Sequence, residues 1–303
     1  MRSFPVGRSR AEGARTVRLT SVNMLEMPPS WPARIRALAA GELVPVPPKP
    51  SATVVLLREG AAGPEAYLLR RRATMAFAGG MYAYPGGGVD PRDREVRPPW
   101  AGPSTARWAG WLGVDEPTAC AVLCAAVRET FEEAGVLLAG PDAGTLVEPR
   151  DWAAERAALE RHEVSLAEFL TEQRLVLRSD LLAPWARWVT PEFEERRFDT
   201  WFFVAALPPG QAAADTVGEA DRVAWMTPAA AVAGFEAGEF GMLPPTVTVL
   251  RELLPLGSAA GAAAAARGRT VAPVLGRAEV AGDRMTVRWS GYDELTIDGV
   301  FPA

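Results

Sequence analysis

The chain has 303 residues, of which 49% are hydrophobic, and a formal net charge of −5. This composition excludes an intrinsically disordered chain, and the length allows one large domain or two small ones. No basic stripe marks a nucleic-acid-binding surface, so electrostatics disfavour non-specific binding to DNA. No apolar run reaches the roughly 18–20 residues of a membrane span. We therefore expect neither a nucleic acid nor a membrane as a partner.

The chain has two cysteines and a single histidine. Cys120 and Cys124 lack the C-x-x-C spacing of zinc and redox sites, so we expect buried thiols and a cytoplasmic, reducing location. The N-terminus has arginines but no apolar h-region, so no secretory signal is predicted. His162 lies in a charged stretch and is expected to be an exposed helix residue. One histidine excludes a multi-histidine metal site and makes a serine–histidine triad improbable, so any general base must be another residue.

Residues 1–48 are predicted to form a partly flexible N-terminal extension, since the arginine-rich start has no pattern and the proline-rich end favours an extended chain. Ordered structure is expected to begin with a buried strand at 52–57, followed by a second strand at 66–70. Arg70, Arg71 and Arg72 lie at the end of this second strand. Either they meet solvent there, or they reach the phosphates of a substrate, whose oxygens match a guanidinium fork.

Gly86, Gly87 and Gly88 follow in a loop, where glycine lets the backbone turn tightly and approach a ligand. Such glycines are usually only a turn. Because these precede an acidic helix, they favour the floor of a metal site, with the Gly87 carbonyl as a candidate ligand. The next segment, 94–115, is rich in proline and tryptophan and is predicted to be a folded surface excursion.

The signals at both ends of residues 116–136 predict a helix. Asp115 can cap its first turn, Pro117 suits that turn, and Gly135 suits its end. One face is an apolar stripe made by four side chains at helical spacing: Cys120, Cys124, Val127 and Phe131. The stripe predicts that this helix packs against the core.

The opposite face of the same helix carries Glu129, Glu132 and Glu133, at spacing i, i+3 and i+4. Carboxylates at this spacing repel each other by roughly 0.2–0.5 kcal/mol per pair. Arg128 can relieve one of them, and a divalent cation would relieve the rest. Oxygen ligands select Mg²⁺ or Mn²⁺ over zinc. The alternative is a solvated charged face.

Two segments together resemble the signature of the Nudix hydrolase superfamily. Residues 84–90 resemble its glycine-rich opening, and residues 128–136 resemble its R-E-U-x-E-E-x-G-U half, where U is a bulky aliphatic residue. The chain departs from the signature at Thr130, which occupies a U position, and at Cys120, which stands where a glutamate is usual. Asp93 is the acidic residue at the usual distance from the loop, so residues 94–115 form an insertion between the two halves.

The resemblance implies an α/β fold, the Nudix-type α/β/α sandwich with a mixed sheet, helical insertions and an extra C-terminal segment. The domain would span 49–256, with insertions at about 94–115 and 140–190. Residues 257–303 are expected to be a C-terminal tail with edge strands, including 279–280 and 285–289. The R-R-F-D-T-x-F-F segment at 196–203 resembles the coenzyme A diphosphatase branch with long insertions.

The resemblance further implies an enzyme that uses Mg²⁺ or Mn²⁺ to hydrolyse the diphosphate bond of a nucleoside diphosphate derivative. The branch implies coenzyme A or acyl-coenzyme A, cleaved to 3′,5′-ADP and (acyl-)4′-phosphopantetheine. The catalytic candidates are Arg128, Glu129, Glu132 and Glu219. Arg128 would orient the glutamates. Glu219 precedes Trp225 by six residues, and Glu194 and Glu195 are its alternatives. The metal candidates are Glu129, Glu132, Glu133, Gly87 and Glu219, and the substrate-binding candidates are Arg70, Arg71, Arg72, Gly86 and Gly87.

Three other interpretations stay open. Another Nudix substrate, such as ADP-ribose, NADH or a dinucleotide, would need the same metal-binding face and a different pocket. A non-catalytic nucleotide-binding module would bind without turnover, although a pure binder has no need to keep the repulsion among its acids. A structural protein would bind neither metal nor nucleotide. The expected partner is a small-molecule nucleotide, and the expected oligomeric state is a monomer or homodimer.

Overall fold

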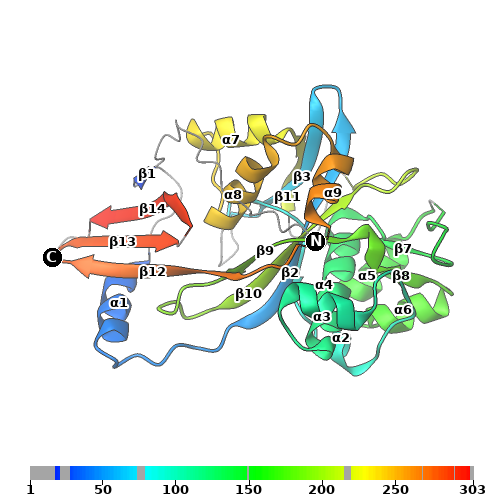
Figure 1. Cartoon of the computed structure of the whole chain (residues 1–303), viewed down its shortest axis with the longest axis horizontal. Helices are drawn as coiled ribbons and strands as arrows, with labels where there is room; N and C mark the ends of the chain where they lie inside the picture. Colours follow the sequence, from blue (N-terminus) through cyan, green and yellow to red (C-terminus); the bar gives the residue numbers. More distant parts are fainter. Residues whose placement is uncertain are drawn as a thin grey trace, which may run out of the picture.

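The computed structural model describes residues 18–20, 28–73, 79–148, 150–214, 220–267, 269–289 and 291–300. A sheet of 11 strands runs through this part of the chain, in the order β1-β14-β13-β12-β9-β10-β2-β3-β11, with β4 paired to β3 and β5 to β2 (Figure 1). Its strands are β1 (Arg18–Thr20), β2 (Lys49–Gly60), β3 (Gly63–Arg71), β4 (Tyr82–Ala83), β5 (Gly86–Gly88), β9 (Ala183–Val189), β10 (Phe198–Ala206), β11 (Ala220–Met226), β12 (Pro273–Ala281), β13 (Arg284–Trp289) and β14 (Tyr292–Val300).

Helices and a small second sheet surround this central sheet. The helices are α1 (Trp31–Ala39), α2 (Arg92–Glu95), α3 (Thr105–Leu112), α4 (Glu116–Ala134), α5 (Ala153–Glu160), α6 (Leu166–Glu172), α7 (Pro228–Glu236), α8 (Pro244–Leu253) and α9 (Ala259–Ala266), with a 3₁₀ turn at Ser179–Leu181. The second sheet pairs β6 (Trp100–Ala101), β8 (Val176–Arg178) and β7 (Ala139–Gly140).

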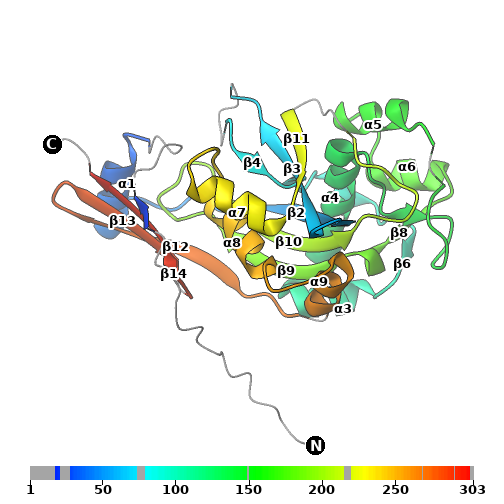
Figure 2. The same ribbon diagram turned by 90° about the horizontal axis from the view of Figure 1, so that it is seen from above.

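The central sheet is mixed, because β2 runs parallel to β10 and antiparallel to β3. Both strands predicted in this region, at 52–57 and 66–70, are confirmed. Successive side chains of a strand point to opposite faces, and both faces of β2 are buried. Leu56 belongs to the core on the α4 side of the sheet, whereas Leu57 belongs to the core that includes residues of α7, α8 and α9. Figure 2 shows α4 to α6 on one side and α7 and α8 on the other, which confirms the α/β/α sandwich.

Helix α4 begins and ends where the sequence signals predict. The Asp115 carboxylate accepts a hydrogen bond from the Thr118 backbone N–H at 2.8 Å, and Gly135 ends the helix in the left-handed conformation, with φ 67°. Cys120 and Cys124 are buried in the core, as expected for structural thiols. The helix therefore presents its last two turns, with their acids, at a fixed place beside the sheet.

The segment 94–115 is not a surface excursion, and that prediction is wrong. Helix α3 packs against α4, and Trp108 and Leu112 are fully buried. Trp108 also meets Phe203 of β10, with 5.9 Å between the ring centroids. The large aromatic side chains of the segment thus complete the core beside α4, because their apolar area is most stable away from water.

His162 does not lie in a helix, so that prediction is wrong as well. It follows α5 in a turn and has a positive φ of 56°, a conformation that no regular helix contains. Its side chain is exposed, as expected, and its Nδ1 lies 3.1 Å from Asp90 Oδ2. The turn after α5 thereby contacts Asp90, which follows the glycine segment 86–88.

The C-terminal strands continue the central sheet. β12 pairs in parallel with β9, and β12, β13 and β14 follow one another in antiparallel order. The strand residues predicted at 279–280 and 285–289 lie in β12 and β13, and α1 packs against β12. The division into segments 1–48, 49–256 and 257–303 stays a prediction. No helix in the described ranges combines the length and apolar character needed to cross a bilayer.

Candidate active site

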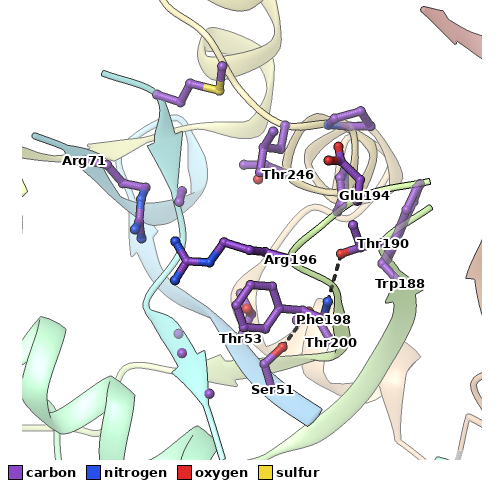
Figure 3. Close-up of a pocket in the computed structure, with 18 of the residues that line it drawn as sticks. Ser51, Thr53, Arg71, Trp188, Thr190, Glu194, Arg196, Phe198, Thr200 and Thr246 are labelled. Atoms are coloured by element: carbon purple, nitrogen blue, oxygen red, sulfur yellow. Dashed lines mark hydrogen bonds between the residues drawn. The ribbon is translucent and has the colours of Figure 1, made fainter. Parts of the chain in front are cut away.

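A cavity of about 1020 Å³ is lined by both glycine and acidic motifs and by distant parts of the chain. We call Arg128, Glu129, Glu132 and Glu133, from the last turns of α4, its carboxylate end. Its aromatic end consists of four side chains from α1, β9, the β9–β10 loop and β13: Trp31, Trp188, Phe193 and Trp289. Figure 3 shows the wall between them, with residues of β2, β3, β9, β10 and the β9–β10 loop.

Arg128 holds the carboxylate end together. Its Nη1 donates to Glu129 Oε1 at 2.7 Å and to Glu132 Oε2 at 3.1 Å, and its Nη2 donates to the Gly88 carbonyl at 2.8 Å. Nε and Nη2 both lie 3.4 Å from Asp93 Oδ2. Burial lowers the pKa of Arg128, but the surrounding carboxylates outweigh this effect and leave it above its usual value. One buried cation therefore fixes the orientation of three acids and ties them to the glycine segment.

Glu132 is a buried acid of the carboxylate end with one oxygen that lacks a partner among the described residues. Its Oε1 is buried and has no hydrogen-bond partner among the described residues, while its Oε2 accepts from Arg128. Burial raises the pKa of Glu132 to about 7, against the opposing effect of Arg128. A buried carboxylate oxygen without a partner is costly, so this atom is suited to bind a ligand or cation.

The glycine segment fits closely around the other two acids. The Gly86 backbone N–H donates to Glu133 Oε2 at 2.7 Å. A side chain at Gly87 would collide with the Glu129 carboxylate, so glycine there allows backbone and carboxylate to approach each other. The two segments that the sequence suggested as one site are thus in direct contact.

These residues fit an Mg²⁺ or Mn²⁺ ion by their chemistry. In the arrangement seen here, no group of three or more His, Cys, Asp or Glu residues within the described ranges is gathered closely enough to enclose a metal ion. Glu129 and Glu132 form ion pairs with Arg128 instead. The available donors are nevertheless all oxygens, and Glu132 Oε1 has no partner in the part of the chain that the structure describes. Hard divalent cations prefer such a donor set.

Comparison with known proteins finds similar sequences. The model of the NUDT19 Nudix domain matches residues 109–253. The acyl-coenzyme A diphosphatase NUDT19 of Xenopus laevis is 27% identical over 225 residues, which are 62% of this chain and 59% of that protein. The human protein of the same name is 27% identical over 227 residues, covering 61% of this chain and 59% of its own length. The match therefore spans about three fifths of these relatives.

A solved structure extends the likeness to the fold. The Nudix hydrolase from Alicyclobacillus acidocaldarius shares 29% sequence identity, with a TM-score of 0.62, and the match covers 72% of this chain and 96% of that one. The chain is thus similar to Nudix hydrolases in sequence and in fold. The acids and glycines of the carboxylate end are those through which the sequence resembles the Nudix signature.

Asp93 supplies a fourth acid that the predicted site did not include. It is buried in α2 and contacts Arg128, and burial raises its pKa. Along the sequence, Asp93 lies as far from the glycine segment as the first acidic position of the Nudix signature does. This spacing could have identified Asp93 as a site residue. Cys120, which stands at the usual sequence distance before Arg128, lies in the core cluster instead. The insertion at 94–115 thus follows Asp93, so the first acidic position of the signature stays next to the glycine segment in the sequence.

The three arginines predicted to bind substrate have different surroundings. Arg71 lines the cavity and points into it (Figure 3). Arg70 donates through Nε to Asp221 Oδ1 at 2.7 Å, and its pKa is raised by this hydrogen bond. Arg72 is exposed, and neither it nor Arg70 is among the described residues that line the cavity. Only one of the three is therefore placed to reach a substrate in the cavity.

The predicted base candidates also differ. Glu219 lies outside the described residues. Glu194 and Glu195, its alternatives, both line the cavity. Burial raises the pKa of Glu194, whereas Glu195 is exposed and pairs with Arg34 at 3.3 Å. Of these alternatives, Glu194 has the environment that favours proton uptake, because burial raises its pKa.

Two features of the cavity had no role in the sequence prediction. Arg196 lines the cavity from the β9–β10 loop. Its position in the R-R-F-D-T-x-F-F segment, which carries the family resemblance, could have identified it as a site residue. The aromatic end brings together residues from opposite ends of the chain. Trp31 and Phe193 meet edge to face with 5.1 Å between ring centroids, and Trp188 lies 6.4 Å from Trp289. No local pattern predicts such contacts.

Proposed function

We propose that this protein is a Nudix hydrolase that cleaves the diphosphate bond of coenzyme A or acyl-coenzyme A, to give 3′,5′-ADP and (acyl-)4′-phosphopantetheine. The observation that carries the proposal is the carboxylate end, where Arg128 fixes Glu129 and Glu132 and leaves Glu132 Oε1 without a partner. The names of the relatives, which match about three fifths of their length, support the coenzyme A substrate.

Glu129, Glu132 and Glu133, with the Gly87 carbonyl, would hold Mg²⁺ or Mn²⁺, which when bound neutralises charge on phosphate oxygens and acidifies water. Arg128 orients Glu129 and Glu132 through ion pairs. The Gly86 N–H fixes Glu133 through its hydrogen bond. These contacts pre-set the carboxylates, so little reorganisation is needed when the anionic substrate arrives.

The proton released by the attacking water would go to a carboxylate. Glu219, as predicted from its position before β11, and Glu194, with its raised pKa and its place in the cavity wall, are the two proposed acceptors. Arg71 is proposed to bind substrate phosphate from the end of β3. A cytoplasmic location and a monomer or homodimer are part of the same proposal.

A substrate panel tests this function. Coenzyme A, acetyl-coenzyme A, ADP-ribose and NADH are incubated with Mg²⁺ or with Mn²⁺, and products are detected by mass. We expect the coenzyme A forms to be cleaved fastest and Glu132→Gln to lower turnover by about 100-fold or more. Glu116→Gln is the control, because Glu116 lies in the first turn of the same helix and outside the cavity lining.

Each alternative has its own outcome in this panel. Faster cleavage of ADP-ribose or NADH would replace the proposed substrate but keep the metal site. Tight nucleotide binding without turnover would support the binding module, and absence of metal and nucleotide binding in calorimetry would support a structural protein. If Glu132→Gln turns over as fast as the parent, the role given to Glu132 is wrong.

A further inference from the structure

The turn between α5 and α6 brings the only histidine of the chain into the wall of the cavity. His162 lines the cavity together with the two residues before it, Glu160 and Arg161. Helix α5, which ends at Glu160, packs against α4 (Figure 2). Burial is the main cause of the raised pKa of Glu132, and the charges of Glu129 and Glu160 add to it. The turn therefore lies near the carboxylate end.

Two charged residues that follow the glycine segment hold His162. Arg92 Nη1 donates to the His162 carbonyl at 2.9 Å, and Arg92 Nη2 lies 3.0 Å from His162 Nδ1. Asp90 Oδ2 lies 3.1 Å from the same Nδ1 and accepts from Arg92 Nη2 at 2.8 Å. The Asp90 N–H donates to the Asp93 carboxylate, which contacts Arg128. A continuous set of contacts thus joins the imidazole to the carboxylate end.

These contacts leave one side of the imidazole for a ligand. Both partners lie at Nδ1, and His162 Nε2 has no hydrogen-bond partner within the described ranges. A bound anion is an acceptor, so it selects the forms of the ring that carry a proton on Nε2. The neutral ring that accepts from Arg92 at Nδ1 has this proton, and so does the protonated ring that donates to Asp90. The ring is therefore set to donate one hydrogen bond to a phosphate oxygen.

The backbone at His162 has a conformation that favours glycine. Its φ is 56°, and the N–H of the next residue donates to the Ala158 carbonyl at 2.9 Å, the bond that commonly closes a helix with glycine at this position. Arg174 follows α6 in the same way, with φ 56° and the equivalent bond to the Leu170 carbonyl at 2.8 Å. Arg174 is exposed and outside the cavity lining. The two positions share one backbone geometry, and of this pair His162 alone lies at the cavity.

We propose that His162 binds a phosphate oxygen of the diphosphate of the substrate through Nε2, and that Arg92 is the positioning residue that sets its ring. The inference rests on the proposed function, in which the diphosphate lies at the carboxylate end. The hydrogen bond holds the anion and requires no exchange of a proton. It gives the insertion at 140–190 a direct part in substrate binding.

Calorimetry in the presence of Mg²⁺ tests this contact without turnover of coenzyme A. 5′-ADP, which carries a diphosphate, is compared with adenosine, which carries no phosphate. We expect His162→Gly to weaken the binding of 5′-ADP about tenfold, as for the loss of a hydrogen bond to a charged group, and to leave that of adenosine unchanged. His162→Asn should do the same, because asparagine tolerates this backbone conformation but lacks the imidazole.

Arg174→Gly is the matched control, because it makes the same backbone change away from the cavity. It should leave both affinities unchanged. Glycine suits the backbone at both positions, so both glycine variants should unfold close to the temperature of the parent. If His162→Gly binds 5′-ADP as tightly as the parent does, His162 only ends a helix and the proposal is overturned. Equal losses for 5′-ADP and adenosine would overturn it too, since the effect would not come from a phosphate.

A double-mutant cycle tests the positioning by Arg92. Arg92→Gln should weaken the binding of 5′-ADP in the parent but cause little further loss in His162→Gly, because Arg92 acts through the ring. Arg94→Gln is the control, since Arg94 lies in the same helix, α2, is exposed and does not line the cavity. It should leave the affinity unchanged. Losses that add fully in the double variant would overturn the role given to Arg92.

Turnover separates the role of His162 from the function on which it rests. His162→Gly should raise KM for coenzyme A about tenfold with little change in kcat, as expected when binding alone is lost. If the parent cleaves no nucleotide but His162→Gly still weakens the binding of 5′-ADP, the proposed function fails and the contact stands. If the parent cleaves coenzyme A and His162→Gly leaves KM unchanged, the contact fails and the function stands.

Discussion

The carboxylate and aromatic ends of the cavity are stabilised in opposite ways. At the carboxylate end, Arg128 is 3% exposed and balances several buried acids, so the region depends on one charge. At the aromatic end, Trp31 packs on Phe193 and Trp188 on Trp289, so the region depends on the contact area of large side chains. The stability of the carboxylate end should therefore depend on pH and on the charge of Arg128. The stability of the aromatic end should depend on side-chain volume.

Removal of the buried cation should have the largest effect. Arg128→Met leaves acids at the carboxylate end without a counter-charge, and we expect a loss of about 3–5 kcal/mol in the free energy of unfolding. Urea denaturation measures it. The loss should be smaller at pH 5 than at pH 8, because protonation relieves unpaired carboxylates. Arg161→Met, which breaks an exposed pair with Glu163, should leave stability near that of the parent. Equal stability of the two variants would contradict the role of Arg128.

Truncation at the aromatic end should cost somewhat less and follow a different pattern. Trp289 is 6% exposed, and we expect Trp289→Ala to lower the free energy of unfolding by about 3 kcal/mol. This loss should be the same at pH 5 and pH 8, since no charge is involved. The same urea experiments measure it. A strong pH dependence of the loss would show that the two ends are not stabilised in different ways.

Glu132 should make the metal-free protein less stable as pH rises. Its folded pKa of about 7 lies above the usual 4.5, so the folded state keeps a proton that the unfolded state has lost between these values. The free energy of unfolding should thus fall by about 1–3 kcal/mol from pH 4.5 to 7, given about 1.4 kcal/mol per pKa unit. Urea denaturation in EDTA measures it, and Glu132→Gln should flatten the dependence. An unchanged slope in that variant would assign the effect to another group.

Substitutions at two neighbouring glycines, Gly87 and Gly88, should have the smallest effect and test a single contact. A side chain at Gly87 meets the Glu129 carboxylate, whereas one at Gly88 meets nothing within 4 Å. Gly87→Ala should therefore displace Glu129 and lower kcat/KM by about tenfold, while Gly88→Ala stays near the parent. Because the Glu129 side chain can move, both variants should unfold at nearly the same temperature. Equal activity of the two variants would show that the contact of Gly87 with Glu129 has no role in turnover.

The sequence by itself determined the parts of the site that depend on short-range geometry. Helix α4 was predicted over 116–136 and spans Glu116–Ala134, because its caps and its spacing of acids involve residues at most four positions apart. The two motif halves also predicted that the glycines and the glutamates share one site, and Gly86 does contact Glu133. The α/β/α sandwich followed from the same resemblance.

Only the tertiary structure decided which side chains face the cavity from elsewhere. It turned Arg71 inward and Arg70 to Asp221, placed Arg196 in the lining of the same cavity, and placed the tryptophans of α1 and β13 in one wall. These contacts depend on how β2, β9, β10 and β12 are ordered in the sheet, which joins strands far apart in the chain. Periodicity shows which face of a strand is apolar, but it carries no information about which distant strand lies beside it.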